Sequence, residues 1–531
     1  MEREFNVTGS CVPNKHYMVN ITNKFNQVMK LIEKGKYFTI NRPRQFGKTT
    51  MLFNIARALR QDDRYILSRM SFEGIGDTIF ENEHTFSPRF VKLFAQSLKM
   101  FYPDTAEKVL ELGKDVADLE TLSEFITQFV KHFDKQVVLL IDEVDKSSNN
   151  QLFVSFIAML RDKFLKRDDG EDFTFQSVIL AGVHDVKSLK LKIRQGDEVK
   201  LNSPWNIAAD FNVDMSFNPA EIKTMLVDYA EQNSVKMNYD TIAEHIYYYT
   251  SGYPFLVSKI CKNIDEEEAD QNPDYDPKHW TLADIDWSFK WLTRASYTTT
   301  NFDDLAKNLE NNPKLYDLVY QVLFSPSENL PNFSLLDPVV NLGSLYGVLA
   351  ERSEKLAVHN RIYEQLISNY MISRQHTRGH GYSFNGYQRK YLDDRDNLDI
   401  SKTLLKFQEF MQEHYSSKDK KFLEREGRLI FMSFLKPIIN GNGFMWKEPV
   451  VADERRMDIV ITFGKEQKEV IELKIWNGQS YHEKGLQQLS DYLDFQGIKN
   501  GYLLIYDFSK NKEYKSEQIQ FKDKSIFATW I

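Results

Sequence analysis

Three consecutive residues, Gly47, Lys48 and Thr49, have the types and the order needed to hold a phosphate group. A glycine lets the backbone come close to a phosphate, and the N–H groups at the start of the following helix attract an anion. Lys48 would reach the β- and γ-phosphates, and the Thr49 hydroxyl would coordinate Mg²⁺. The segment 37–50 therefore predicts a nucleotide-phosphate site between a short strand and a helix.

The same segment departs from the motif G-x-x-x-x-G-K-[ST] at one position, because Arg42 stands where the first glycine belongs. The turn at this position must therefore fit a residue that carries a Cβ. We expect nucleotide contacts from the whole loop and the helix start, namely Arg42, Pro43, Arg44, Gln45, Phe46, Gly47, Lys48, Thr49 and Thr50.

A buried strand that ends in two acids supports the phosphate site. Val137–Ile141 is apolar, and Asp142 and Glu143 follow it directly, a pattern that resembles a Walker B strand. Asp142 would hold Mg²⁺ through water, and Glu143 would polarise the attacking water. These elements predict ATP and Mg²⁺ as cofactors. The alternative is that Lys48 and Asp142 are degenerate remnants in a structural domain.

A second set of reactive side chains, Asp458, Glu472 and Lys474, lies near the C-terminal end. Apolar alternation on both sides of Gly464 predicts a β-hairpin over 456–476. Glu472 and Lys474 would share one face of their strand, and an odd-length turn would set Asp458 opposite Glu472.

Two carboxylates in this position suit Mg²⁺ or Mn²⁺, which would activate water against a phosphodiester. Lys474 would orient that water or steady the developing charge. The alternative is an exposed cross-strand ion pair worth under about 1 kcal/mol. Apolar flanks at Val470, Ile471, Leu473 and Ile475 favour a buried strand.

Asp458 followed by Glu472-Leu-Lys474 after a hairpin resembles the PD-(D/E)XK nuclease superfamily, over about residues 401–531. Gln488 and Tyr492 are similar to the Gln-x-x-x-Tyr element of its exonuclease-like branch, which implies a catalytic role for both. Glu426 is similar to the upstream metal-binding glutamate of the superfamily, and Glu424 is its rival. The implied metal ligands are Glu426, Asp458 and Glu472. We expect His482 to be a surface residue near this site.

The segments Phe5–Met18 and Asn41–Thr49 resemble the bacterial AAA-like ATPase family, over roughly residues 5–370. The phosphate loop of that family reads Arg-Pro-Arg-x-[Phe/Tyr]-Gly-Lys-[Ser/Thr], so Arg42 matches the variant of the family. Gly252-Tyr-Pro254 is similar to a tripeptide of STAND-type ATPases that opens a nucleotide-sensing helical lid, and it also reads as a plain turn. Residues 310–370 resemble the winged-helix segment that follows such lids.

Ser177–Ala181 resembles the sensor strand of these ATPases. His184 and Asp185 follow it, and they either report on the γ-phosphate or simply cap a loop. Arg194 is the candidate arginine finger.

The elements that must position these residues fit a chain of several domains. The chain has 531 residues, which suggests three or four domains. Helical periodicity over Ile21–Lys34 and Lys48–Leu59 alternates with strand patterns at Tyr37–Ile40, Val137–Ile141 and Ser177–Ala181. This alternation predicts an α/β fold with a parallel sheet. A mostly helical pattern then runs from Pro219 through Tyr370.

We expect the following organisation: an N-terminal arm over 1–20, a P-loop ATPase domain over 21–215, a helical lid and winged-helix-like region over 216–375, a linker over 376–400, and a small α/β restriction-endonuclease-like domain over 401–531.

Composition restricts the function classes. The net charge of −8 excludes a globally basic nucleic-acid coat, so such contacts need local basic patches. Candidate patches are Lys187, Lys190, Lys192 and Arg194 in one segment, and Arg455 with Arg456 in another. Two cysteines cannot form a disulfide framework and fit a reducing compartment. We see no signal peptide and no apolar run that would span a bilayer, and we expect a cytoplasmic protein without membrane contact.

The sequence favours an ATPase that gates a metal-dependent nuclease, with DNA favoured over RNA and, by resemblance, a link to defence against mobile elements. The alternative is a non-catalytic nucleotide-dependent switch that recruits a partner, with a nuclease-like domain that binds nucleic acid without cutting it. Homo-oligomerisation and a protein trigger stay open. Nothing after residue 215 supports a plain transporter or metabolic NTPase.

Overall fold

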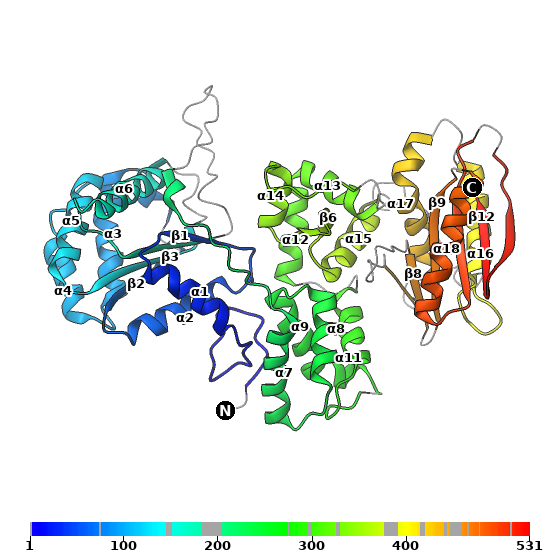
Figure 1. Cartoon of the computed structure of the whole chain (residues 1–531), viewed down its shortest axis with the longest axis horizontal. Coiled ribbons are helices and arrows are strands. Elements are labelled where there is room, and N and C mark those ends of the chain that lie inside the picture. The colour runs from blue at the N-terminus through cyan, green and yellow to red at the C-terminus, as the bar shows by residue number, and fades with distance from the viewer. Residues whose placement is uncertain are drawn as a thin grey trace. The chain divides into compact units, whose positions relative to one another are not determined.

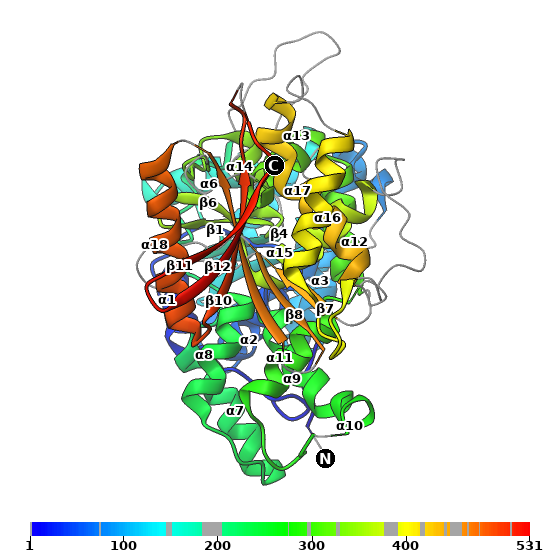
Figure 2. The same cartoon turned by 90° about the vertical axis from the view of Figure 1, so that its right-hand side faces the viewer.

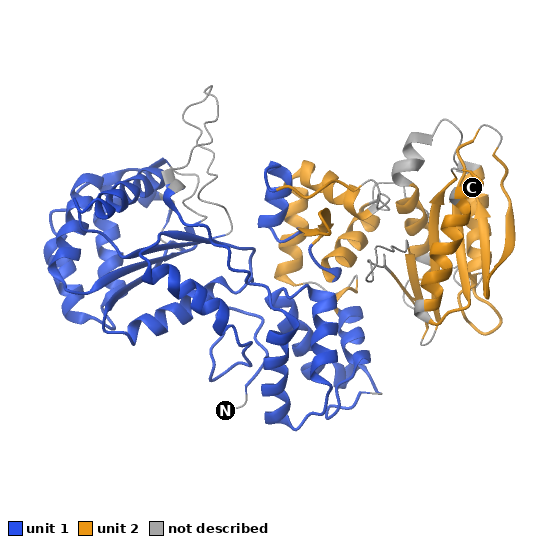
Figure 3. Ribbon diagram, in the orientation of Figure 1, with its two compact units in different colours: residues 1–291, 335–349, 359–361 blue, residues 292–334, 350–358, 362–531 orange. Residues whose placement is uncertain are grey.

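The computed structural model describes residues 3–73, 76–144, 151–182, 204–273, 275–294, 299–324, 330–375, 391–414, 420–439, 443–446, 459–464, 467–476, 478–509 and 512–531. The chain divides into two compact units, coloured separately in Figure 3. Unit 1 comprises Met1–Trp291, Leu335–Leu349 and His359–Arg361. Unit 2 comprises Leu292–Ser334, Ala350–Val358 and Ile362–Ile531.

Unit 1 is built on a parallel sheet of four strands in the order β1-β4-β3-β2. The strands are β1 (Phe38–Asn41), β2 (Tyr65–Ser71), β3 (Gln136–Asp142) and β4 (Ser177–Gly182). Asn41 pairs with Gly182, and Ser71 pairs with Asp142, so the carboxyl ends of the strands lie along one edge. The predicted α/β fold with a parallel sheet is confirmed for this unit.

Helices cover both faces of this sheet (Figure 1). On one face, side chains of α3, α5 and α6 pack against Leu139 and Ile141 of β3 in a core rich in phenylalanine. Helices α1 and α2 lie on the other face. The bounds are α1 (Thr22–Glu33), α2 (Lys48–Arg60), η1 (Asp77–Phe80), α3 (Glu83–Leu98), α4 (Pro103–Leu112), α5 (Leu119–His132), α6 (Gln151–Asp168) and η4 (Pro204–Ile207).

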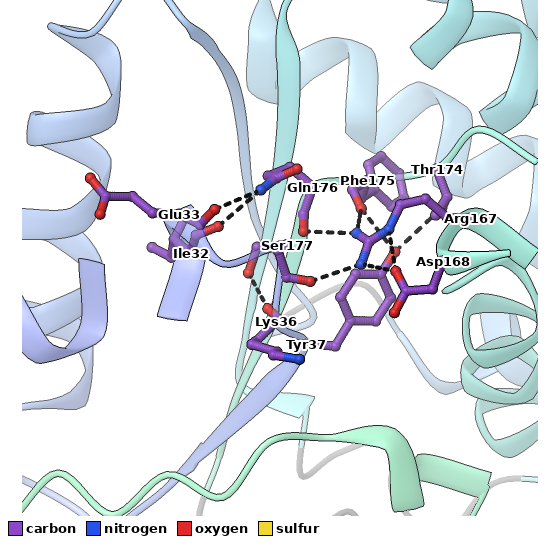
Figure 4. A network of polar contacts seen from close by, with 11 residues as sticks. Ile32, Glu33, Lys36, Tyr37, Arg167, Asp168, Thr174, Phe175, Gln176 and Ser177 are labelled. Carbon is purple, nitrogen blue, oxygen red and sulfur yellow. Dashed lines mark hydrogen bonds and ion pairs between the residues drawn. The ribbon is translucent and has the colours of Figure 1, made fainter. Parts of the chain in front are cut away.

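A polar network fixes the amino ends of β1 and β4, opposite the edge where the acids emerge (Figure 4). The Arg167 guanidinium at the end of α6 donates to the carbonyl oxygens of Phe175, Gln176 and Gly35 at 2.9, 3.0 and 3.0 Å. The Ser177 hydroxyl donates to the Lys36 carbonyl oxygen at 2.6 Å. One cation thus satisfies backbone carbonyls from two chain segments that must lie side by side.

A group of helices follows the sheet where the sequence predicts a lid; the name lid is kept for residues 219–292, and the lid role stays a prediction. Its helices are α7 (Pro219–Asn233), α8 (Tyr239–Thr250), α9 (Pro254–Glu266), α10 (Glu268–Gln271) and α11 (Leu282–Leu292). Asn218 and Glu221 form a capping box at the start of α7, and proline occupies the first turn of both α7 and α9. These local signals explain why helix begins directly after each loop.

The N-terminal arm packs on this lid. The Phe5 ring lies 4.8 Å from that of Tyr229 and 6.2 Å from that of Trp280, measured between ring centroids. Arg3 donates to both carboxylate oxygens of Asp228 at 2.7 Å. Because Phe5 is buried, the arm contributes to the packing of the lid.

The described residues of 299–375 form four helices and a two-stranded sheet: α12 (Thr300–Glu310), α13 (Pro313–Phe324), α14 (Pro338–Leu345), β5 (Leu349–Arg352), β6 (Lys355–Val358) and α15 (Arg361–Gln375). Helices followed by a hairpin are the elements that the winged-helix resemblance implies. Its assignment as a winged helix stays a prediction.

Unit 2 contains a mixed sheet of six strands in the order β11-β12-β10-β9-β8-β7. The strands are β7 (Gly443–Trp446), β8 (Ile459–Phe463), β9 (Gln467–Ile475), β10 (Asn500–Tyr506), β11 (Ser516–Phe521) and β12 (Lys524–Trp530). Strands β8 and β9 form the predicted antiparallel hairpin, with Phe463 opposite Gln467 and Ile459 opposite Ile471. The connecting turn is therefore odd in length, as expected.

Helix α18 (Gln479–Gln496) lies on one side of this sheet, and α16 (Ile400–His414) and α17 (Lys420–Ile439) lie on the other (Figure 2). Leu489 and Leu493 of α18 pack with Val470, Leu503 and other strand side chains. On the opposite face, the Tyr506 hydroxyl donates to the Gly427 carbonyl oxygen at 2.6 Å. The small C-terminal α/β sheet is present as predicted, while its restriction-endonuclease-like identity stays a prediction.

Within the described ranges, no helix is both long and apolar enough to cross a membrane.

Candidate functional site

The candidate phosphate loop joins β1 to α2 at the carboxyl edge of the sheet. Gly47 has a φ of +79°, in the left-handed region that glycine adopts without strain, and α2 begins directly after it. Gln45 also has a positive φ of +55°. The chain therefore turns sharply into the amino end of α2, where the first N–H groups have no carbonyl partner within the helix and the helix dipole favours an anion.

Lys48 is anchored inside this loop. Its side chain is only 8 % exposed, and its Nζ donates to the carbonyl oxygens of Arg42 and Pro43, each at 2.8 Å. A buried ammonium group held by backbone oxygens keeps its charge close to the loop. The loop thus concentrates a cation at the position expected for phosphate binding.

Thr49 and Asp142 connect the loop to the strand acids. Burial raises the pKa of the Asp142 carboxyl above its ordinary value. The backbone N–H of Glu143, the charges of Arg69 and Lys48 and a hydrogen bond from Thr49 act in the opposite direction. A hydroxyl and a buried carboxylate side by side fit the oxygen ligands that Mg²⁺ takes in such loops, directly or through water.

A cavity of about 540 Å³ opens beside the loop. Lys48, Thr49 and Glu143 line one part of it. The N-terminal arm and the lid supply other walls, with Asn6, Val7, Thr8, Cys11, Val19 and Ile21 from the arm and its junction with α1, and Met225, Pro254, Phe255 and Ser258 from the lid. Polar groups at the loop and apolar groups opposite suit a ligand with a charged and a flat apolar end.

Arg42 does not line this cavity within the described residues. Its guanidinium donates to the Val213 carbonyl oxygen at 2.7 Å and lies 5.2 Å from the ring centroid of Phe211. Pro43 is likewise not among the lining residues, whereas Arg44, Gln45, Phe46, Gly47, Lys48, Thr49 and Thr50 are. The structure therefore gives Arg42 a packing contact with the segment that follows the sheet.

The Gly252-Tyr-Pro254 segment touches the phosphate loop directly. The Tyr253 hydroxyl donates to the Arg44 carbonyl oxygen at 2.6 Å, and its ring lies edge-on to Phe46 at 4.7 Å between centroids. Gly252 has a φ of +71°, and a Cβ there would lie 2.0 Å from the Phe217 carbonyl oxygen. This glycine is required at the junction between the lid and the site.

Residues 10–273 match the family model described as the AAA-like domain.

This chain contains an AAA-like domain.

Several solved structures resemble the chain. A Walker-type ATPase of Pyrococcus abyssi is 10 % identical with a TM-score of 0.45, and the match covers 68 % of this chain and 99 % of that one. The RuvB Holliday junction branch migration motor of Thermotoga maritima is 14 % identical with a TM-score of 0.32, covering 66 % and 95 %. The ORC2 protein of Aeropyrum pernix is 10 % identical with a TM-score of 0.35, covering 70 % and 98 %. The search of curated proteins found no match.

The AAA-like domain also contains site residues that the sequence did not single out. The backbone N–H of Cys11 in the arm donates to the Thr50 hydroxyl at 3.1 Å. Lys24 of α1 lines the cavity and donates to Glu221 of α7 at 2.6 Å. No local sequence pattern predicts either contact, because the partners are far apart in the chain. The resemblance of 5–18 to the AAA-like family was the one signal that pointed to the arm.

Several predicted residues of the AAA-like domain lie outside the described residues: the candidate sensors His184 and Asp185, the candidate finger Arg194, and Lys187, Lys190 and Lys192 of the basic patch.

A second polar cluster lies in unit 2, between β9 and α18. Glu472 is 1 % exposed, and its Oε1 lies 3.0 Å from the Nζ of Lys474. The same Nζ donates to the Gln488 side-chain oxygen at 3.0 Å. The structure thus brings together three of the predicted catalytic residues, Glu472, Lys474 and Gln488, on the α18 side of the sheet. The alternative of an exposed ion pair does not fit, because Glu472 is buried.

Tyr492 is the fourth described residue of the predicted catalytic set in this domain. It is buried in the apolar core with Val470 and Leu503, one turn along α18 from the exposed Gln488. The described β8–β9 ladder ends at the Ile459–Ile471 pair, directly before Glu472. Asp458, Arg455, Arg456 and the side chains of Glu424 and Glu426 lie outside what the structure describes.

No set of three or more His, Cys, Asp and Glu side chains in the described ranges could hold a metal ion. Of the predicted ligands at this cluster, Glu472 is the described one, and carboxylate oxygens are donors that Mg²⁺ and Mn²⁺ take.

Proposed function

We propose that this chain is a nucleotide-gated nuclease. Its AAA-like domain would bind and hydrolyse ATP with Mg²⁺, and its C-terminal sheet domain would hydrolyse phosphodiester bonds, with DNA favoured as substrate. The observation that carries the cutting activity is the buried Glu472, 3.0 Å from Lys474. Buried charged side chains are rare without a function or a compensating partner.

In the AAA-like domain, each residue has a distinct role. Lys48 would exchange its two carbonyl partners for the β- and γ-phosphates, and the N–H groups at the start of α2 would complete the anion site. Thr49 and Asp142 would hold Mg²⁺, which neutralises charge on the phosphates. Glu143 lines the same cavity and would orient the attacking water.

The nucleotide assignment is tested by titrating Lys48→Ala with a fluorescent ATP analogue. We expect a loss of affinity of at least tenfold, since charge-assisted contacts to phosphate are worth about 1.5–3 kcal/mol. Lys36→Ala, a substitution at the opposite end of β1, serves as the control and should bind like the parent. Equal affinity of Lys48→Ala and the parent would refute the assignment.

In the C-terminal domain, the residues would divide the work of hydrolysis. Glu472 would hold the divalent ion, which activates water and stabilises charge on the phosphate. Lys474 would orient that water or steady the developing negative charge, and Gln488 would position the Lys474 ammonium group. Glu426 and Asp458 are proposed as further ligands on the resemblance to the PD-(D/E)XK superfamily.

The cutting activity is tested by incubating labelled DNA and RNA with the protein and Mg²⁺ or Mn²⁺, with and without ATP. Glu472→Gln keeps the shape of the side chain and should abolish degradation. Glu469→Gln, on the opposite face of the same strand, is the matched control and should cut normally. If Glu472→Gln degrades nucleic acid as fast as the parent, the catalytic assignment is wrong.

ATP can gate this activity only if it binds one arrangement of the protein better than another. A dependence of cutting on ATP that Lys48→Ala removes would support the gate. The alternative is a nucleotide-dependent switch that recruits a partner through a non-cutting C-terminal domain. It is favoured if DNA binds in an ATP-dependent manner and no metal supports cleavage.

A further inference from the structure

An aromatic cluster follows the Glu472–Lys474 pair along β9, where this strand packs against α18. Along β9, Glu472, Lys474 and Trp476 alternate in sequence on the side of α18. The stem of Lys474 passes Gly485 of α18, where an added Cβ would lie 3.6 Å from its Cε. One turn before Gly485, the His482 ring lies 5.6 Å from that of Trp476. The aromatic pair Trp476 and His482 therefore lies next to Lys474, two residues further along β9 and one turn earlier on α18.

Trp530 and several backbone hydrogen bonds hold this cluster in place. The Trp530 ring lies 5.6 Å from His482 and 6.3 Å from Trp476 between centroids, and it is buried. The Trp476 backbone N–H donates to the Tyr506 carbonyl oxygen at 2.8 Å. The Gln408 amide donates to the Trp530 carbonyl oxygen at 2.7 Å. Trp476 and His482 nevertheless stay partly exposed.

Two features of the cluster suit a nucleotide. Burial lowers the pKa of the His482 imidazole, which favours the neutral form of this flat ring. Lys515 places its ammonium group 4.3 Å from the Trp530 ring centroid, and Lys474, which is paired with Glu472, precedes Trp476 by two residues on β9. Glu483 and Glu517 also lie in the electrostatic surroundings of His482, so the cluster is not uniformly positive. Aromatic faces beside cations are the features that bind unpaired bases and their phosphates.

We infer that Trp476 and His482 form a stacking platform for an unpaired nucleobase next to Lys474, so that the substrate is a single strand or a frayed end. This inference rests on the proposed nuclease function. A base inside a duplex has both faces covered by its neighbours, and it could use the platform only after it leaves the stack. The platform therefore selects substrates with free bases.

The experiment measures binding without cutting. A fluorescein-labelled single-stranded thymidine 12-mer and a 12-base-pair duplex are titrated with the full chain in EDTA, and the anisotropy is followed. We expect Trp476→Leu to weaken single-strand binding at least about fivefold, since a base stacked on an aromatic ring contributes that much. Trp476→Phe keeps an aromatic face and should retain most of the affinity. Duplex binding should change little in either variant.

Trp287→Leu is the matched control, because Trp287 is also partly exposed and stacks on a second tryptophan, Trp291, at 5.2 Å. Thermal unfolding of each variant shows whether the fold is kept. If the leucine variant is unstable, the smaller ring of Trp476→Phe should still weaken single-strand binding more than duplex binding. Unchanged single-strand affinity in Trp476→Leu, equal losses for single strand and duplex, or no binding of either probe would each overturn the inference. A protein that never cuts but binds single strands through Trp476 would refute the nuclease and keep the platform.

Discussion

The ammonium group of Lys474 lies 3.0 Å from a carboxylate oxygen of Glu472, a residue that is almost fully buried. Removal of the lysine alone would leave a buried carboxylate without this cation. We expect Lys474→Met to destabilise unit 2 by about 1–3 kcal/mol, measured by urea unfolding. The double variant Glu472→Gln with Lys474→Met should lose less than the sum of the two single changes. Additive losses would show that the two side chains do not interact.

Arg42 and Arg44 stand two residues apart in the phosphate loop but face different surroundings. Arg44 lines the cavity, whereas Arg42 donates to the Val213 carbonyl oxygen. Arg42→Met should therefore lower thermal stability, by about 1–3 kcal/mol for the lost bonds to buried carbonyls, and change ATP affinity little. Arg44→Met should weaken ATP binding and change thermal stability little. Isothermal titration and thermal unfolding of both proteins check this, and a larger loss of affinity for Arg42→Met would contradict it.

Gly252 and Gly170 share a left-handed backbone, with φ of +71° and +77°, but differ in the space around them. An added Cβ at Gly170 meets nothing within 4 Å, while one at Gly252 meets the Phe217 carbonyl oxygen at 2.0 Å. Gly170→Ala should cost about 1–2 kcal/mol of strain. Gly252→Ala should cost clearly more and weaken ATP binding, because the lid junction must shift. Comparable melting temperatures for the two variants would rule out this account.

The buried carboxyl of Glu268 predicts a pH dependence. Burial, with help from Asp284, raises the pKa of Glu268 to about 8, although the Asn272 amide opposes the shift. The unfolded chain loses this proton near pH 4.3, so between about pH 4.3 and 8 the folded state binds more protons. The free energy of unfolding therefore falls as pH rises through this window, by up to about 1.4 kcal/mol per pH unit.

Glu268→Gln removes this titration, and its unfolding free energy should depend less on pH than that of the parent. Denaturant unfolding at pH 5, 6, 7 and 8 measures the two slopes. Parallel curves would mean that Glu268 ionises normally in the folded protein.

Much of the fold could be predicted from local pattern. The apolar run 137–141 ahead of Asp142 and Glu143 predicted β3 and its acids, because a strand buried on both faces reads as a continuous apolar segment. Alternation about Gly464 predicted the β8–β9 hairpin and its odd turn. In both cases the information lies within a few neighbouring residues.

Other features depend on contacts that local pattern does not encode. Gln488 and Tyr492 are four apart on α18, yet the first reaches Lys474 and the second enters the apolar core. The spacing fixes their relation to each other but not which way the helix is rotated over the sheet. The contact of Phe5 with Tyr229 and Trp280 joins distant parts of the chain, so no periodicity reveals it.

The placement of the N-terminal arm has a practical consequence for dissecting the protein. The family match starts at residue 10, whereas Asn6, Val7 and Thr8 already line the cavity and Phe5 is packed on the lid. A fragment that begins at residue 10 would keep the entire phosphate loop and would lack the part of the cavity lining that the arm supplies. Weak nucleotide affinity in such a fragment would result from the loss of the arm residues that line the cavity, and it would not show that the phosphate loop is unable to bind nucleotide.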